Sequence, residues 1–431
     1  MRKLRILQGP GPICGQAWAL SRGLVQLGHD SKSGIVAIEG QEHNKYKYPF
    51  DMELPINGGW INGTNQFLKN NIHNFDIFHF HARSFFHFNP WPVFPTGLDI
   101  LGLRLSGKKV FFHFRGSEVR RKSRQLEKNP FNYVESAPEA FKRSDEDKEN
   151  FIKYIKTVCN GVFVVDREVN ENVGGGTEVP ICLDLEDWKF VGQLRKKTPV
   201  IVHAPSHQGI KGTEEIVNAL NSLKQKGISF EYKQVEGMCN EDARKLYESA
   251  DIIIDQLKMG WFGTLTVEAM ALGKPVICYL REDLLQSPDE FPIVNATPQN
   301  IEPILENLII DSDLRNRIAY RGREFAEEHH CCVKAAQIAE SVYQQSFEIN
   351  NFDLDLYFDL IQAKAEKSDN KLNEALKQTR EMMRSRFMGE LRDLKLAHAI
   401  ALKQARRTAI TGGLTKRGRN ILKNIKNKLT G

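Results

Sequence analysis

The chain has 431 residues, 60 of them Lys or Arg and 54 Asp or Glu, and 41% are hydrophobic, enough for two or more domains with buried cores. No run approaches the ~18 apolar residues of a membrane span, and MRKLRILQGPGP does not fit a secretory signal peptide, so we expect a cytoplasmic protein that can lie on the inner face of the membrane. The seven cysteines show no CxxC spacing, which supports neither a disulfide framework nor a zinc site.

The amino-terminal stretch predicts a strand, a glycine-rich turn and an amphipathic helix. Gly9, Gly11 and Gly15 let the backbone approach a ligand, and Glu39 ends the next predicted strand. This arrangement is compatible with a dinucleotide site that uses Glu39 for the ribose. Two prolines in the turn remove amide donors that a pyrophosphate needs, so the pattern alone is weak evidence for NAD.

The next predicted strand, DIFHFH, carries two histidines at alternating positions. Alternation places His79 and His81 on one face of the sheet. A hydrogen-bonded core role is the simple interpretation of His79, whereas His81 falls at the carboxyl end of the strand and is a candidate for positioning an acceptor. The aromatic loop at residues 82–95 is a candidate for stacking on a sugar or lipid, although such clusters are more often packing residues.

A further strand begins at Val110 and ends in the turn RGSE. Arg115 supplies a fixed positive charge at this turn. His113 lies two residues upstream on the same strand face and is the alternative candidate.

After a polar, basic linker, the stretch VIVHAPSHQGIKGTEE starts a second domain. Gly212 and Thr213 open a helix whose amide donors and dipole favour an anion. We expect Lys211, just ahead of that start, to be an exposed point charge for a diphosphate, with Ser206 in the preceding loop. Gly237 ends a later strand with a turn toward the same cleft.

Residues 251–280 predict a complete strand, turn, helix and strand. Gly273 stops the helix before a proline opens the last strand. Ligands of parallel sheets bind outside the carboxyl ends of the strands, so Gly263, Thr264 and Glu268 should face a crevice. The helix-start amides suit a phosphate, and the carboxylate suits a ribose diol.

The pattern F-G-x-x-x-x-E-A-M-A-x-G-K-P-V at 262–276, together with HAPSHQGIKGT at 203–213, resembles the nucleotide-sugar signature of GT-B glycosyltransferases, family 4-like (glycosyl transferases group 1). The resemblance covers roughly residues 1–345 and is strongest at 200–280. It implies that Lys211 binds a diphosphate, that the amides of Gly263 and Thr264 assist, and that Glu268 holds the ribose. Gly11 and Gly15 would then face the interdomain cleft.

Two positions depart from the resembled pattern. A histidine is common where Arg115 stands, and the usual first glutamate of E-x-F-G is replaced by Gly260. That glutamate commonly contacts the transferred sugar, so its absence leaves the sugar identity open. A subgroup with a G-W-F/Y-G version is known, so the departure does not imply an inactive protein.

The carboxyl-terminal tail is basic and falls outside the resemblance. No acidic residue follows Asp393, whereas ten Lys and Arg do, and without these ten the chain has more acidic than basic residues. Ile421, Leu422, Ile425 and Leu429 form an apolar stripe among lysines, typical of a helix that lies on an anionic membrane, so residues 394–431 are the candidate surface. A solvated or partner-binding helix is the alternative. No aromatic residue follows Phe387 to stack on bases, so no nucleic acid is expected.

Together these observations predict an α/β, GT-B architecture: two Rossmann-like doubly wound domains facing a cleft, plus a helical basic extension. The predicted boundaries are an acceptor-side domain at 1–190, a donor domain at 198–335, a crossover helix region at 336–365 and the basic tail at 366–431.

The predicted activity is transfer of a sugar from a nucleoside diphosphate donor to a hydroxyl of a glycan or lipid-linked glycan, with retention and without a metal, in cell-surface polysaccharide or lipopolysaccharide synthesis. No cofactor is expected beyond the nucleotide sugar as substrate. The candidate catalytic residues are His81, His113, Arg115 and Lys211. The alternatives are a GT-B-fold epimerase or non-catalytic nucleotide-sugar-binding protein, and an NAD-dependent Rossmann enzyme.

Overall fold

A computed structural model describes residues 2–11, 13–37, 47–55, 60–84, 98–194, 198–347 and helical residues between 374 and 403. Glu39, the aromatic loop from 85 to 95 and the tail beyond 403 lie outside the described residues. The chain divides into two compact units, Met1–Leu360 and Ile361–Gly431. No helix of the described residues is long and apolar enough to cross a membrane.

The first half of the larger unit is built on a parallel sheet in the order β3-β2-β1-β4-β5-β6-β7. Its strands are β1 Arg5–Gly9, β2 Asp30–Ala37, β3 Met52–Pro55, β4 Ile77–His81, β5 Lys109–Phe114, β6 Gly161–Val164 and β7 Thr177–Glu178. Its helices are α1 Gln16–Gln26, α2 Trp60–Asn71, α3 Leu98–Leu105, α4 Lys122–Lys128, α5 Asp145–Val158 and α6 Arg167–Val173.

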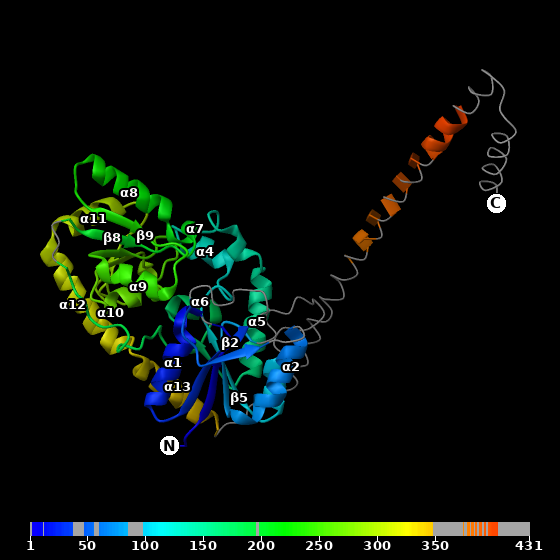
Figure 1. Cartoon of the computed structure of the whole chain (residues 1–431), viewed down its shortest axis with the longest axis horizontal. Helices are drawn as coiled ribbons and strands as arrows, with labels where there is room; N and C mark the ends of the chain where they lie inside the picture. The colour runs from blue at the N-terminus through cyan, green and yellow to red at the C-terminus, as the bar shows by residue number, and fades with distance from the viewer. Residues whose placement is uncertain are drawn as a thin grey trace. The chain divides into compact units, whose positions relative to one another are not determined.

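The second half has its own parallel sheet, in the order β12-β11-β10-β8-β9. Its strands are β8 Val200–His203, β9 Glu231–Gln234, β10 Ile252–Ile254, β11 Val276–Cys278 and β12 Val294–Asn295. The helices here are α7 Gln208–Lys211, α8 Thr213–Gln225, α9 Asn240–Ser249, α10 Thr264–Ala271, α11 Ile301–Ile310 and α12 Ser312–His329. Figure 1 shows α8 and α11 beside β8 and β9.

The final helix of the larger unit, α13 Cys332–Ser346, returns to the first sheet and packs beside α1 (Figure 1). The close approach requires Gly23, because a Cβ there would lie 2.1 Å from the carbonyl oxygen of Cys332. Alanines of α13 and Tyr343 join the first core with Leu20 and Leu24. The second half has a separate core around β8, β10, α8 and α11.

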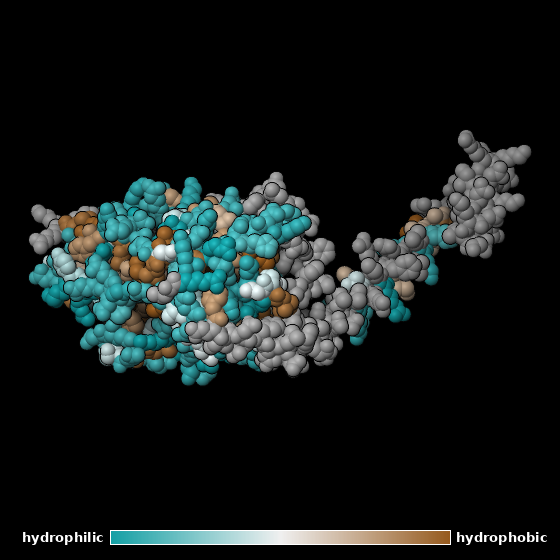
Figure 2. All heavy atoms as spheres, turned by 90° about the horizontal axis from the view of Figure 1, so that it is seen from below, coloured by the Kyte–Doolittle hydropathy of each residue, from teal (hydrophilic) through white to brown (hydrophobic). Residues whose placement is uncertain are grey.

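Strand sequence explains why both sheets are buried. The three isoleucines of β10 are each 0% exposed, as expected for a parallel strand covered on both faces. In the first sheet, pairing sets Gln8 beside His79 and His81 beside His113. Outside these layers the visible surface is mostly hydrophilic with scattered apolar patches (Figure 2).

Candidate functional site

A cavity of about 320 Å³ opens between the carboxyl ends of the two sheets. It is lined by segments that follow β5 and β6 of the first sheet and β8, β9 and β10 of the second. Of the residues predicted from the sequence, those that line it are Arg115, Ser206, Lys211, Gly237, Gly263, Thr264 and Glu268. The structure therefore brings together candidates from both halves.

The predicted glycines play different parts. Gly15 has φ of +71° at the start of α1 and lines a smaller cavity that shares Glu268 with the main one. Gly212, with φ of +72°, separates α7 from α8, and a Cβ there would lie 3.0 Å from Cβ of Leu257. Gly11 is buried and is not part of the lining. Neither Gly212 nor Gly11 lines the cavity.

Lys211 is less exposed than the sequence suggested. Its Nζ donates to Oδ1 of Asp255 at 2.5 Å and to Oε1 of Gln256 at 2.8 Å. Only 13% of the lysine side chain is exposed, and Asp255 is fully buried. The expectation of an exposed lysine is wrong, because a buried carboxylate at the end of β10 holds its charge.

The start of α10 is only partly available to a ligand. The Gly263 amide donates to Oδ2 of Asp255 at 3.2 Å, and the Thr266 hydroxyl donates to the same oxygen at 2.7 Å. Asp255 therefore already occupies one amide assigned to the phosphate. Thr264, the first residue of α10, lines the cavity, and its helix-start amide has no partner within the helix.

Glu268 lies one turn into α10 and is 5% exposed. Burial, followed by the charge of Asp255, raises the pKa of Glu268 to about 8, although Arg244 and Lys211 oppose the shift. The carboxyl group is consequently protonated at neutral pH in the unbound protein. It can then donate as well as accept a hydrogen bond to a diol.

Arg115 extends into the same cavity from the end of β5. Glu118 accepts hydrogen bonds from the backbone amides of Arg115 and Gly116, the latter at 3.1 Å, which stabilises the turn. The Arg115 side chain donates from Nη2 to Nδ1 of His81 at 2.8 Å. Burial lowers its pKa to about 10, so the guanidinium stays charged at neutral pH.

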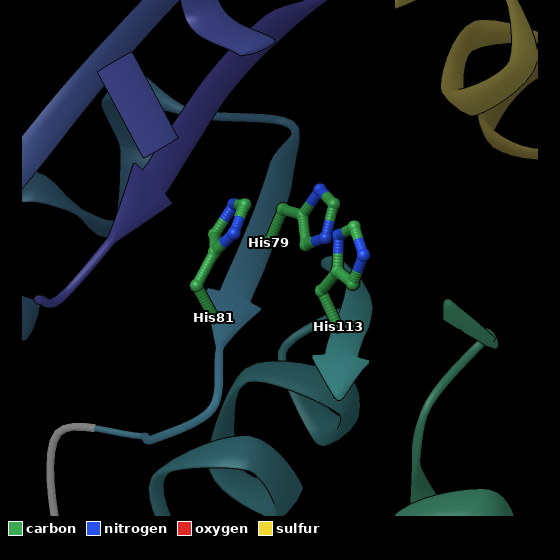
Figure 3. A group of neighbouring side chains, drawn as sticks. All are labelled: His79, His81 and His113. Atoms are coloured by element: carbon green, nitrogen blue, oxygen red, sulfur yellow. The ribbon is translucent and has the colours of Figure 1, made fainter. Parts of the chain in front are cut away.

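The structure corrects the predictions for His81 and His113. Both side chains are 0% exposed and neither lines the cavity. They stack with His79, at ring-centroid distances of 4.5 to 5.5 Å (Figure 3). His79 has the predicted core role and shares a 2.5 Å hydrogen bond with Tyr343. A direct contact of His81 or His113 with an acceptor is therefore excluded in this conformation.

Among the described residues, these three histidines form a group whose spacing could suit a metal, because their possible ligand atoms lie within 4.8 Å of one another. The surroundings do not fit a cation. Both ring nitrogens of His81 are engaged, Nε2 with Oε1 of Gln8 at 2.7 Å and Nδ1 with the cationic Arg115. Stacked rings also direct their in-plane lone pairs side by side and not toward one point.

Sequence reasoning missed several residues of the site. Asp255, which binds Lys211, and Gln256, which lines the cavity, directly follow the isoleucine run of β10. The signal that could have identified them is an acidic residue at the carboxyl end of a strand. Asp166 follows β6, accepts from the Val169 amide at 2.8 Å and lines the cavity. Burial, and then Glu168, raises the pKa of Asp166.

Gly260 cannot be replaced by the usual glutamate without rearrangement. Its φ is +86°, and a Cβ would lie 2.9 Å from both Cγ and Cδ of Arg281. Arg281 is itself 2% exposed and pairs with Glu171 at 2.9 Å and Asp283 at 2.6 Å. The turn therefore favours glycine because its φ is positive and Arg281 leaves no space for a Cβ.

Two Rossmann-like halves with a cleft between their strand ends define a GT-B fold, and the predicted resemblance is confirmed at the level of the fold. Among solved structures the chain is similar to HepE from Anabaena in complex with UDP and glucose, at 14% identity over 79% of this chain and 99% of that one, with a TM-score of 0.54. It is also similar to sucrose-phosphate synthase from Thermosynechococcus elongatus, at 13% identity over 81% and 100%, with a TM-score of 0.55.

A third similar structure is the catalytic domain of starch synthase IV from Arabidopsis thaliana bound to ADP and acarbose, at 11% identity over 81% and 100% of the two chains, with a TM-score of 0.53. No family model matches the sequence. No curated protein matches it either.

Proposed function

We propose that this protein is a glycosyltransferase that moves a sugar from a nucleoside diphosphate sugar to a hydroxyl of a glycan or lipid-linked glycan. The observation that carries the proposal is one cavity lined by Lys211, the start of α10 and Glu268 from the second half and by Arg115 from the first. The two cations Lys211 and Arg115, the helix-start amide of Thr264 and a buried carboxyl group match the diphosphate and ribose of such a donor.

In the proposed reaction the largest electrostatic demand is the charge that develops on the leaving diphosphate. Lys211, the Thr264 amide and Arg115 lie where they can stabilise it, so we propose that the reaction does not depend on a metal. The acceptor hydroxyl would approach on the leaving-group side, with the diphosphate taking its proton and the configuration retained. Glu268 would hold the ribose.

The comparisons support the donor class. HepE was solved with UDP and glucose and with UDP-glucose, and starch synthase IV with ADP and acarbose. These ligands belong to those proteins, and they favour a nucleoside diphosphate hexose for this chain without choosing the base.

We further propose a role in cell-surface polysaccharide or lipopolysaccharide synthesis, with the basic tail docked on an anionic membrane. Each of the ten basic residues after Asp393 is worth about 1 kcal/mol near an anionic leaflet. Full-length protein should co-sediment with phosphatidylglycerol vesicles at low salt and be released at high salt, while a protein ending at Asp393 should stay in the supernatant. Equal recovery of both proteins in the supernatant would remove the membrane proposal.

A non-catalytic or epimerase-like nucleotide-sugar-binding protein is the second candidate. It is favoured by Gly260, which stands where a glutamate commonly contacts the sugar and where the backbone leaves no room for one. An NAD-dependent enzyme would use Glu39, which lies outside the described residues.

The deciding experiment is release of free nucleoside diphosphate from a panel of UDP-, GDP- and ADP-sugars, with and without membrane extract. A transferase should release the diphosphate from one donor, faster with extract, and place the labelled sugar in the extract. Epimerised donor, or binding without release, would favour the second candidate.

A further inference from the structure

Three cationic side chains line the cavity, and two of them are already paired. Lys211 is held by Asp255, and Arg120 donates from Nε to Oε2 of Glu168 at 2.7 Å. Arg115 differs, because its Nε and Nη1 are buried and have no hydrogen-bond partner among the described residues. A buried guanidinium with two unused donors is costly unless a ligand completes it.

Nη2, the third nitrogen of the Arg115 guanidinium, is held in place by a buried chain of hydrogen bonds. Because arginine can only donate, Nδ1 of His81 must accept from Nη2. Burial holds the pKa of His81 well below its usual value, so the ring is neutral, and its Nε2–H donates to Oε1 of Gln8 at 2.7 Å. Gln8 in turn donates from Nε2 to the hydroxyl of Tyr343 at 3.3 Å.

This chain joins elements that are distant in the sequence. Tyr343 belongs to α13, Gln8 to β1, His81 to β4 and Arg115 to the turn after β5. Every link before Arg115 is fully buried, so the chain is held in one arrangement by the core around it. His113 lies in the same histidine stack, but no hydrogen bond joins it to Arg115 or to this chain (Figure 3).

We propose that Arg115 is an anion-binding residue of the cleft and that the Tyr343–Gln8–His81 chain positions its guanidinium for a bidentate contact with an oxyanion. The ligand class is a phosphate or carboxylate group, and, resting on the proposed function, it belongs to the nucleotide-sugar substrate. Its source is either the diphosphate or a carboxylate on the transferred sugar. The second N–H of Nη2, together with Nε–H on one edge of the guanidinium or with an N–H of Nη1 on the other, matches two oxygens of either group.

The first test is calorimetric titration with inorganic pyrophosphate, which does not depend on the identity of the nucleotide. Arg115→Met should weaken binding about 10- to 100-fold, as expected for loss of a charge-assisted pair of hydrogen bonds. His81→Phe should weaken it about 3- to 10-fold because the guanidinium loses its anchor. The matched control His113→Phe, in the same stack, should bind as the wild type does.

Two further measurements separate positioning from general damage. Thermal unfolding should show His81→Phe and His113→Phe shifted by similar amounts, and His81→Gln, which keeps an acceptor for Arg115, should recover part of the affinity. Equal affinities of the His81 and His113 variants would overturn the positioning chain.

Titration with UDP-glucose and UDP-glucuronate identifies the source of the anion. Equal losses for both ligands in Arg115→Met indicate the diphosphate, and a loss confined to the glucuronate indicates the sugar carboxylate. Unchanged affinity for pyrophosphate and both nucleotide sugars in Arg115→Met, or no binding of any of them by the wild type, would overturn the anion site. If pyrophosphate binding depends on Arg115 but none of the UDP-, GDP- and ADP-sugars of the donor panel binds, the anion site stands and the proposed function fails.

Discussion

Replacing Lys211 tests both the architecture of the cleft and its chemistry. Lys211→Met keeps the apolar stem and removes the charge, which leaves the fully buried Asp255 without its cation. Breaking a buried ion pair in this way costs about 3–5 kcal/mol, and the partial exposure of the lysine places the expected loss near the lower limit. Diphosphate affinity should fall as well, because the same charge faces the cavity.

The pH dependence of this loss has a definite sign. Burial raises the pKa of Asp255, but Lys211 and the hydrogen bonds from Lys211, Thr266 and Gly263 lower it overall. In the wild type the Lys211–Asp255 pair therefore stabilises the fold above the unfolded pKa of an aspartate, about 3.9. This stabilisation is lost as the pH falls through the folded pKa of Asp255. In Lys211→Met the charge and hydrogen bond of Lys211 are lost, and only the hydrogen bonds from Thr266 and Gly263 still oppose burial. The pKa of Asp255 therefore rises relative to the wild type, so the deficit should grow from acid to neutral pH.

The assay is urea unfolding of the wild type, Lys211→Met, Asp255→Asn and the double variant at pH 4.5 and 7.5. The double variant should recover most of the stability lost by Lys211→Met but none of the diphosphate affinity, since a neutral pair needs no cation. Lys211→Met as stable as the wild type at pH 7.5 would refute the reasoning, because Asp255 would then not depend on the lysine.

Substitutions at Glu268 and Gly260 test the turn and helix that follow β10. Because the folded pKa of Glu268 is raised to about 8, the wild type should lose stability as the pH rises from about 5 to 8. Glu268→Gln should flatten this dependence of stability on pH and should weaken nucleotide binding. A lower melting temperature with normal affinity would indicate a purely structural role. Gly260→Ala should cost about 1–3 kcal/mol in unfolding free energy, because φ is +86° and Arg281 occupies the space of a side chain. For the same reason Gly260→Glu should gain no transfer activity. Full stability of either variant would contradict this packing.

Local pattern was enough to predict the strand, turn and helix that carry the candidate donor-binding residues. The β-branched run, the glycine that ends the helix and the helix start at Thr264 are all sequence-local signals, and the structure has each of them. Lys211 and Glu268 follow from the same local logic, since both sit at fixed distances from a strand end.

The exposure and pairing of the candidate residues depend on contacts between segments that are far apart in the sequence, which local patterns do not predict. Alternation correctly put His79 and His81 on one face, but which face is covered depends on Tyr343, separated from His79 by 264 positions along the chain. The pairing of Lys211 with Asp255 likewise requires β8 beside β10, which topology fixes and periodicity does not. Exposure of candidate residues was therefore the weakest part of the sequence prediction.

The central claim is that the cleft binds a nucleoside diphosphate sugar, and calorimetry of the wild-type protein tests it most directly. Titration with UDP, GDP, ADP, NAD and NADP should give saturable binding of at least one nucleoside diphosphate and none of either dinucleotide, with affinity that falls in Glu268→Gln. Binding of NAD or NADP, without binding of any nucleoside diphosphate, would contradict the account.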